Sequence, residues 1–211
     1  MTNILSDEFW TRLALGLFIN FQIAFSALII GCIVGASLAF ISRRNIPFLT
    51  TTIALLMSIF KATPVFIAIF FLAGIMRPYY RSFEVYFYDP KVVFVIIAAL
   101  PYVISYAYDQ FTDALKKWSD GMRRTALLLV PNMARSFQIL VSTSCFGAAI
   151  GVNEAMSVIL SEAELMNESP WIFGLYLGAI VIFFGLMQTV VGTSRWLHRI
   201  ATTNLSDTPT A

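Results

Sequence analysis

Charged residues are scarce in this chain: lysine, arginine, aspartate and glutamate together make up 12% of its 211 residues. A soluble domain carries about 25% of them. With 58% hydrophobic residues and a mean hydropathy of +0.78, the chain has more apolar surface than one aqueous core can bury. The composition therefore excludes an ordinary soluble domain and predicts that a lipid bilayer is the solvent of this chain.

Cysteine and histidine are equally scarce. Cys32 and Cys145 stand far apart in apolar runs without a CxxC spacing, so we interpret them as buried thiols rather than a redox or metal pair. His198 is the one histidine, which excludes a histidine-based metal site. The sequence has no GxSxG motif and no basic, aromatic-rich stretch typical of nucleic-acid binding. We expect a chain with no catalytic residue, no metal or other cofactor of its own, and no nucleic-acid partner.

Five apolar segments are long enough to cross about 30 Å of hydrocarbon at 1.5 Å per residue. They predict an all-α membrane protein, a single transmembrane domain over residues 1–211, with spans near 13–42, 50–76, 92–111, 137–161 and 171–197. Polar residues around Ser142 and Glu154 interrupt the fourth span. Pro64 and Pro101 lie inside spans two and three and are expected to kink them.

The positive charges predict the orientation. Nine of the fourteen fall in the first and third loops and at the C-terminal end: Arg43, Arg44, Lys116, Lys117, Arg123, Arg124, Arg135, Arg195 and Arg199. Four fall on the other side, and Lys61 falls inside span two. Because positive loops stay in the cytoplasm, we expect the N-terminus outside and the C-terminus in the cytoplasm. The third loop, about 112–136, is long enough to hold its own helix and to dock a soluble partner.

Small residues recur at close-packing spacing in spans one and four, at Gly31, Gly35 and Ala36 and at Gly147, Ala148 and Gly151. Such faces allow helix backbones to approach one another. Two readings stay open: ordinary packing within the bundle, or an interface with a second copy.

Several segments resemble one family. In span two, Lys61, Ala62, Thr63 and Pro64 stand where that family has Arg-Gly-Thr-Pro before an apolar run. Span three ends in SYAYDQFTDAL, and Asp109 precedes Gly121 by twelve positions, the family's spacing from a carboxylate to the glycine that opens its cytoplasmic motif. The C-terminal TSRWLHRI is also similar to the family's basic end. The chain thus resembles the permease subunit of bacterial ABC importers for polar amino acids, of the histidine/glutamine/arginine type.

The cytoplasmic motif itself is degenerate. The family has Glu-Ala-Ala-x-x-x-Gly, whereas this chain has Arg124, Thr125, Ala126 and Val130 at those positions. The motif glutamate and the second glycine are absent, and an Arg would meet the ATPase surface with the opposite charge. A later Lys-Asp-Thr-Ser-Leu element is also missing, which leaves the alignment of residues 140–168 open.

The resemblance implies a five-helix type I importer permease in the bacterial inner membrane, with no catalysis in this chain. Two permeases, either two copies or a copy and a paralogue, would each dock one ATPase, which holds ATP and Mg²⁺. A periplasmic binding protein would deliver the solute, for which the RPYYRS segment and the acidic loop with Glu162, Glu164 and Glu168 are candidate contacts. The resemblance places the ATPase contact at these residues: Lys117, Gly121, Arg123, Arg124, Thr125, Ala126 and Pro131.

The candidate substrate pathway consists of the polar residues inside spans, Lys61, Thr63, Asn153 and Glu154. An ionisable residue at the centre of a bilayer costs on the order of 3 kcal/mol. Lys61 therefore either snorkels to an interface or faces a polar pathway. Glu154, with Asn153, either lines the pathway or belongs to an interfacial loop if span four ends early. For Asp109 we expect a cap or a pair near Lys116 rather than a solute contact.

Two other functions compete with the importer permease. One is an ATPase-independent channel or transporter that oligomerises through its small-residue faces, in which the basic loop is only a topology signal. The other is a non-transporting accessory subunit of a membrane complex, marked by its degenerate motif. Recovery of an ATPase with the chain would separate the first reading from these two.

Overall fold

The computed structural model describes residues 6–44, 46–79, 89–166 and 169–203, and every regular element in these ranges is a helix. Three helices are long and apolar enough to cross a membrane singly: α1 (Asp7–Ser42), α5 (Pro90–Ser119) and α9 (Ser169–Thr202). Two bent helix pairs pass the same test only when each pair is taken together, so the described residues hold three spans, or up to five if each pair is one span, by length and composition. The predicted five spans require each pair to count as one.

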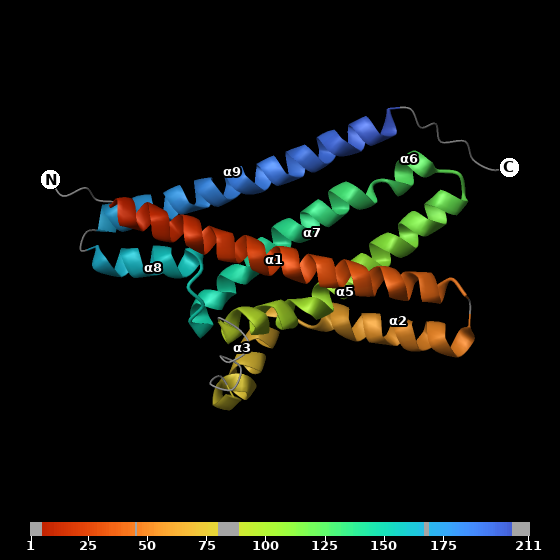
Figure 1. Ribbon diagram of the computed structural model, residues 1–211, viewed down its shortest axis with the longest axis horizontal. Coiled ribbons are helices and arrows are strands. Elements are labelled where there is room, and N and C mark those ends of the chain that lie inside the picture. The colour runs from red at the N-terminus through yellow and green to blue at the C-terminus, as the bar shows by residue number, and fades with distance from the viewer. Residues whose placement is uncertain (1–5, 45, 80–88, 167–168, 204–211) are drawn as a thin grey trace.

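Helix α1 extends beyond the predicted span because its first turn is polar and capped. The Ser6 hydroxyl accepts a hydrogen bond from Phe9 N at 3.2 Å, and the negative charges of Asp7 and Glu8 suit the positive end of the helix dipole. The helix runs the length of the bundle beside α5 (Figure 1). A Cβ on Gly31 would lie 2.5 Å from Val103, and one on Gly35 would lie 2.8 Å from Ala107. This part of the small-residue face therefore packs inside the bundle.

The second predicted span is broken at proline. Helix α2 (Pro47–Ala62) and α3 (Val65–Met76), which continues into the short helix η1 (Arg77–Tyr79), meet at 89°. Thr63 has extended backbone with ψ 111°, as expected for the residue before a proline. The predicted kink at Pro64 is thus confirmed as a sharp break. By contrast, α5 continues through Pro101 as one helix.

The fourth predicted span is also two pieces. After the short helix α6 (Arg123–Ala126), α7 (Leu129–Ser144) and η2 (Cys145–Ile150) form one arm, and α8 (Ala155–Leu165) leaves it at 52°. Gly151 makes the break, because its φ of 84° lies in the left-handed region that favours glycine. Residues 137–161 therefore do not form one continuous helix, and that they form a single span stays a prediction.

The charged segments beside the spans are more helical than predicted. Helix α5 runs to Ser119, past the predicted end at 111, supported by the Lys117–Asp113 ion pair at 2.7 Å one turn apart. Glu162 and Glu164, expected in an outer loop, lie in α8. Half of the RPYYRS segment (residues 80–82) and Glu168 lie outside the described residues.

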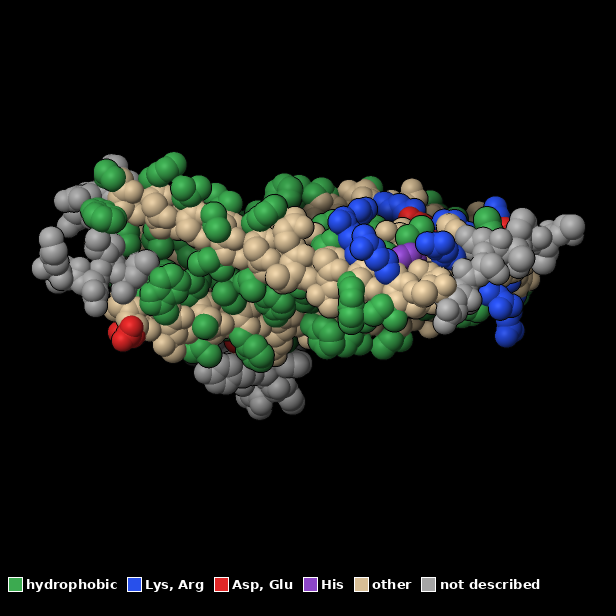
Figure 2. All heavy atoms as spheres, turned by 90° about the horizontal axis from the view of Figure 1, so that it is seen from above, with side chains coloured by type: hydrophobic (Ala, Val, Ile, Leu, Met, Phe, Trp, Pro, Cys, Tyr) green, Lys and Arg blue, Asp and Glu red, His purple; other side chains and the backbone are tan. Residues whose placement is uncertain are grey.

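The bundle is polarised along its long axis. The start of α1, the start of α9 and α8 lie at one end, and α6, the start of α2 and the end of α9 lie at the other (Figure 1). Figure 2 shows lysine and arginine side chains gathered around the histidine at the second end. The loops that carry the nine predicted cytoplasmic charges thus meet at one end of the molecule. Which side of a membrane this end faces stays a prediction.

Candidate functional site

The candidate ATPase contact folds as a compact basic turn, residues 117–131. Helix α5 ends at Ser119, and Gly121 reverses the chain with a φ of 78°, a value at which a side chain would be strained. Met122 N closes the turn on Lys117 O at 2.9 Å. Helix α6 and then α7 follow at once, and Pro131 lies in the first turn of α7. The structure therefore brings the seven candidate contact residues into one turn between two helices, in place of a separate longer coupling helix.

The outer face of the basic turn mixes cations with apolar side chains. Arg123 and Arg124 are exposed, and the Arg123 guanidinium lies 5.6 Å from the centre of the Trp118 ring. Trp118, Leu128 and Val130 are 51%, 40% and 42% exposed. Tryptophan and arginine are enriched among the residues that contribute most to protein–protein binding, so this face is a candidate contact surface.

The inner side of the turn is anchored to the bundle. Ala126 is 4% exposed, and His198 of α9 places its Nδ1 3.1 Å from Leu127 O. Asn132 donates to Gln110 of α5 at 2.6 Å, and Tyr106 donates to Asn132 O at 3.3 Å. These contacts connect the turn to α5, α7 and α9, so a displacement of α6 would be transmitted to all three helices.

Lys61 forms an ion pair with Asp109, at the break in span two. The ammonium lies 2.8 and 2.9 Å from the two carboxylate oxygens, and the side chains are 50% and 44% exposed. Asp109 thus pairs across helices with Lys61, and the expected partner near Lys116 is not the one observed. Thr63 is partly buried, and its hydroxyl donates to Ile59 O at 3.0 Å. The pathway roles of Lys61 and Thr63 stay predictions.

Glu154 is fully buried, and its carboxylate accepts several hydrogen bonds. It caps α8 by accepting from Met156 N at 2.9 Å and Ser157 N at 3.0 Å. Asn20 of α1 donates to the same carboxylate at 2.8 Å and accepts from Ala155 N at 3.1 Å. Within the described chain Glu154 therefore serves as a structural joint between α1 and α8. Its neighbour Asn153 is exposed. The predicted pathway role of both residues stays a prediction.

Asn20 is the polar residue that the sequence interpretation missed. Its amide also donates to Ser144 Oγ at 2.7 Å, so one side chain joins α1, α7 and α8. Asn20 and Gln22 are the polar residues in the otherwise apolar run Leu17–Phe25, which was a signal because polar residues inside spans are costly and need partners.

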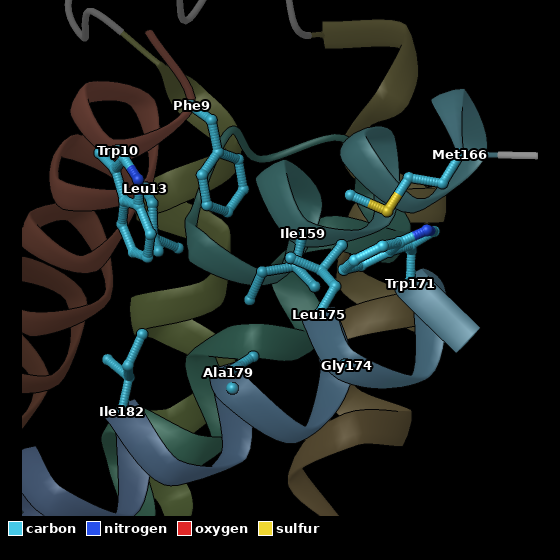
Figure 3. A pocket seen from close by; sticks show the side chains of 11 residues that line it. Phe9, Trp10, Leu13, Ile159, Met166, Trp171, Gly174, Leu175, Ala179 and Ile182 are labelled. Atoms are coloured by element: carbon cyan, nitrogen blue, oxygen red, sulfur yellow. The ribbon is translucent and has the colours of Figure 1, made fainter. Parts of the chain in front are cut away.

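A separate pocket of about 410 Å³ lies at the other end of the bundle, between the starts of α1 and α9 and helix α8 (Figure 3). Its lining is apolar apart from the indoles of Trp10 and Trp171. No group of three or more histidine, cysteine or acidic residues in the described ranges is arranged to hold a metal.

Comparison with known proteins places the chain by its fold. No family model matches the sequence, and no curated protein matches it either. One solved structure does: a chain of the MetNI methionine ABC transporter in inward-facing conformations, from its CY5 native crystal form. The match has a TM-score of 0.65 and 16% identity, and it covers 93% of this chain and 99% of that one.

The chain has the fold of that transporter chain. At this identity the likeness establishes fold alone, and it extends over nearly the whole length of both chains. The helical arrangement that the family resemblance implied is thereby supported in outline. The substrate, the partners and the coupling residues are matters of proposal.

Proposed function

We propose that this chain is the membrane-spanning permease subunit of an ATP-driven ABC importer in a bacterial inner membrane. The observation that carries the proposal is the shared fold with a chain of the MetNI transporter over 93% of this chain. Amino acids are the proposed cargo, because the MetNI transporter is named for methionine and the sequence resembles importers of polar amino acids.

In this proposal the chain does no chemistry. A partner ATPase binds ATP and Mg²⁺, and its closure moves the basic turn, residues 117–131. The hydrogen bonds of Leu127 and Asn132 to α9 and α5 transmit that movement to the spans. The bundle then alternates between two states that a distant ligand biases. A second permease would complete the pathway, and a periplasmic binding protein would deliver the solute.

The basic turn requires an ATPase surface of matching character. Arg123 and Arg124 would meet acidic side chains, and Trp118 and Leu128 would enter an apolar notch. This pairing reverses the charge of the family's motif glutamate, so we propose an ATPase whose docking groove is acidic. A heterodimer with a second permease of ordinary motif would also accommodate the reversal.

Affinity purification of the tagged full chain from its native membrane, with mass spectrometry of what accompanies it, tests the proposal. Stoichiometric recovery of an ATPase is expected. Loss of two charge-assisted contacts in R123Q/R124Q should lower that recovery by about tenfold or more. R43Q/R44Q is the matched control, because it removes the same charge from the α1–α2 turn at the same end of the molecule.

The outcomes separate the possibilities. Recovery of the stable chain without any ATPase would overturn the importer proposal and favour a self-contained channel or an accessory subunit. Recovery that falls equally in both double variants would retain an importer but exclude the basic turn as its specific contact.

A further inference from the structure

Helix α7 turns a polar face outward from an otherwise apolar bundle. Arg135, Gln138 and Ser142 follow one another at three- and four-residue spacing, which places them on one side of a helix. Arg135 and Ser142 are exposed and Gln138 is partly so. The opposite side of α7 is buried against the bundle through Ser136, Leu140, Val141 and Ser144.

A groove runs along this face. It encloses about 520 Å³ and is lined by Arg135, Gln138, Ile139, Ser142, Thr143 and Phe146. We call it the α7 groove. At its far end the Phe146 ring lies 6.1 Å from the ring of Phe66 in α3. The α7 groove therefore begins about one and a half turns into α7 and ends at an aromatic contact beside the break in span two.

Lipid is an unsuitable neighbour for this surface. Arg135 lies just before the predicted start of span four at 137, whereas Gln138, Ser142 and Thr143 lie inside that span, where polar side chains that face lipid are costly. Helix α9 shows the contrast over residues 173–184, where every exposed residue is apolar, including Phe173, Ile180 and Phe184. Helix α9 thus presents an apolar surface suited to lipid there, whereas the α7 surface is mixed: Arg135, Gln138 and Ser142 lie beside Ile139 and Phe146, which are each 47% exposed.

The α7 groove has a positive charge at one end and hydrogen-bond acceptors toward the other. The three ion pairs of the described residues use Arg12, Lys61 and Lys117, so Arg135 has no carboxylate partner among them. Ser142 and Thr143 give their protons to Gln138 O and Ile139 O at 3.1 and 2.8 Å. Their oxygens thus face the groove as acceptors, about 10 Å along the helix from Arg135 at 1.5 Å per residue.

We propose that the α7 groove is a solute site for a zwitterion of amino-acid size. The solute carboxylate pairs with Arg135, and its amino or amide N–H groups reach the oxygens of Gln138, Ser142 and Thr143. This site rests on the proposed importer function and names residues outside the candidate pathway of Lys61, Thr63, Asn153 and Glu154. A bidentate guanidinium–carboxylate pair supplies both attraction and orientation.

Water access to the α7 groove is the first test, and it does not depend on an ATPase. Single cysteines replace Gln138 or Ser142 in the full chain with both native cysteines changed to serine, and native membranes are treated with a membrane-impermeant maleimide on either side. We expect Q138C and S142C to react from one side, while I180C on α9 stays unreactive. If S142C reacts as slowly as I180C, lipid or a second copy of the chain covers the face and the proposal is overturned.

Solute protection is the second test. L-glutamine and L-methionine should slow the labelling of S142C, and the corresponding amino alcohols, which lack the carboxylate, should not. Adding R135Q should weaken protection by about tenfold in concentration, and R135K should restore part of it. Unchanged protection in R135Q would overturn the assigned carboxylate contact.

These results are separable from the proposed function. A labelled and protected groove in a chain that recovers no ATPase would retain the solute site and remove the importer. An ATPase-bound chain with an unreactive α7 groove would retain the importer and remove this site.

Discussion

The side-chain amide of Asn20 donates to the carboxylate of Glu154 at 2.8 Å, across 134 residues of sequence, and both residues are completely buried. This contact joins the middle of α1 to the first residue before α8. It stabilises the break that Gly151 makes in span four: the start of α8 leaves the backbone N–H groups of residues 155–157 without helical partners, and these two side chains accept from them.

Removing Asn20 should loosen this joint. In N20L, Glu154 loses its side-chain donor and Ala155 N loses its acceptor, which should cost about 2 kcal/mol or more of the free energy of unfolding. Thermal unfolding of the detergent-solubilised chain would measure the loss. N20L/E154M should be less destabilised than the sum of the single variants, because both partners are then apolar. Strictly additive losses would contradict a direct contact.

A side chain at Gly16 should displace α8. A Cβ there would lie 2.6 Å from Ala155 N, and backbone cannot yield as a flexible side chain does. We expect G16A to lower the free energy of unfolding by about 1–3 kcal/mol. G185A on α9 is the control, since no atom lies within 4 Å of its added Cβ. Equal stability of G16A and G185A would mean that α8 does not sit against α1 at this point.

The pair between Lys61 and Asp109 should show charge complementarity. Because both side chains are about half exposed, we expect a coupling of about 0.2–1 kcal/mol if water reaches the pair. K61Q and D109N should each lower thermal stability, and K61D/D109K should recover it. A charge swap no better than the single variants would show that the two side chains act separately. The Lys117–Asp113 pair, within one helix, is the comparison.

The backbone at Gly121 should determine where α6 lies. Its φ of 78° makes G121A strained by about 1 kcal/mol or more. Under the proposed function, we expect G121A to reduce ATPase recovery while the chain still inserts and purifies. Gly192, in the last third of α9 with open space around it, provides the control substitution. Wild-type recovery in G121A would mean that the position of α6 does not control docking.

Local sequence was sufficient for some features of the fold. Pro64 removes a donor and disfavours helical backbone at Thr63, so a kink there could be predicted, although α5 continues through Pro101 as one helix. The 89° angle could not, because it depends on what α2 and α3 pack against. Gly151 was noticed only as a small residue, and its positive φ became evident once α8 was seen to turn away.

The candidate site residues likewise include some whose position follows from local sequence and some whose partners depend on the tertiary fold. The seven candidate contact residues lie between 117 and 131 in sequence, so their nearness in the basic turn followed from the sequence, whereas their contact with an ATPase stays a prediction. Asp109 was assigned a local partner near Lys116, yet it pairs with Lys61 because α2 and α5 lie side by side. Asn20 was passed over since its partner is 134 residues away.

The sequence by itself determined the solvent of this protein, the position of its apolar segments and the clustering of its positive charges, since hydropathy and charge are properties of each residue alone. Only the tertiary structure decided that Glu154 is buried and joins α1 to α8, that α5 packs closely against Gly31 and Gly35, and that the polar side of α7 faces outward. These features depend on which helices become neighbours, and the free energy of a buried polar group or a close contact is set by the partner that packing places beside it.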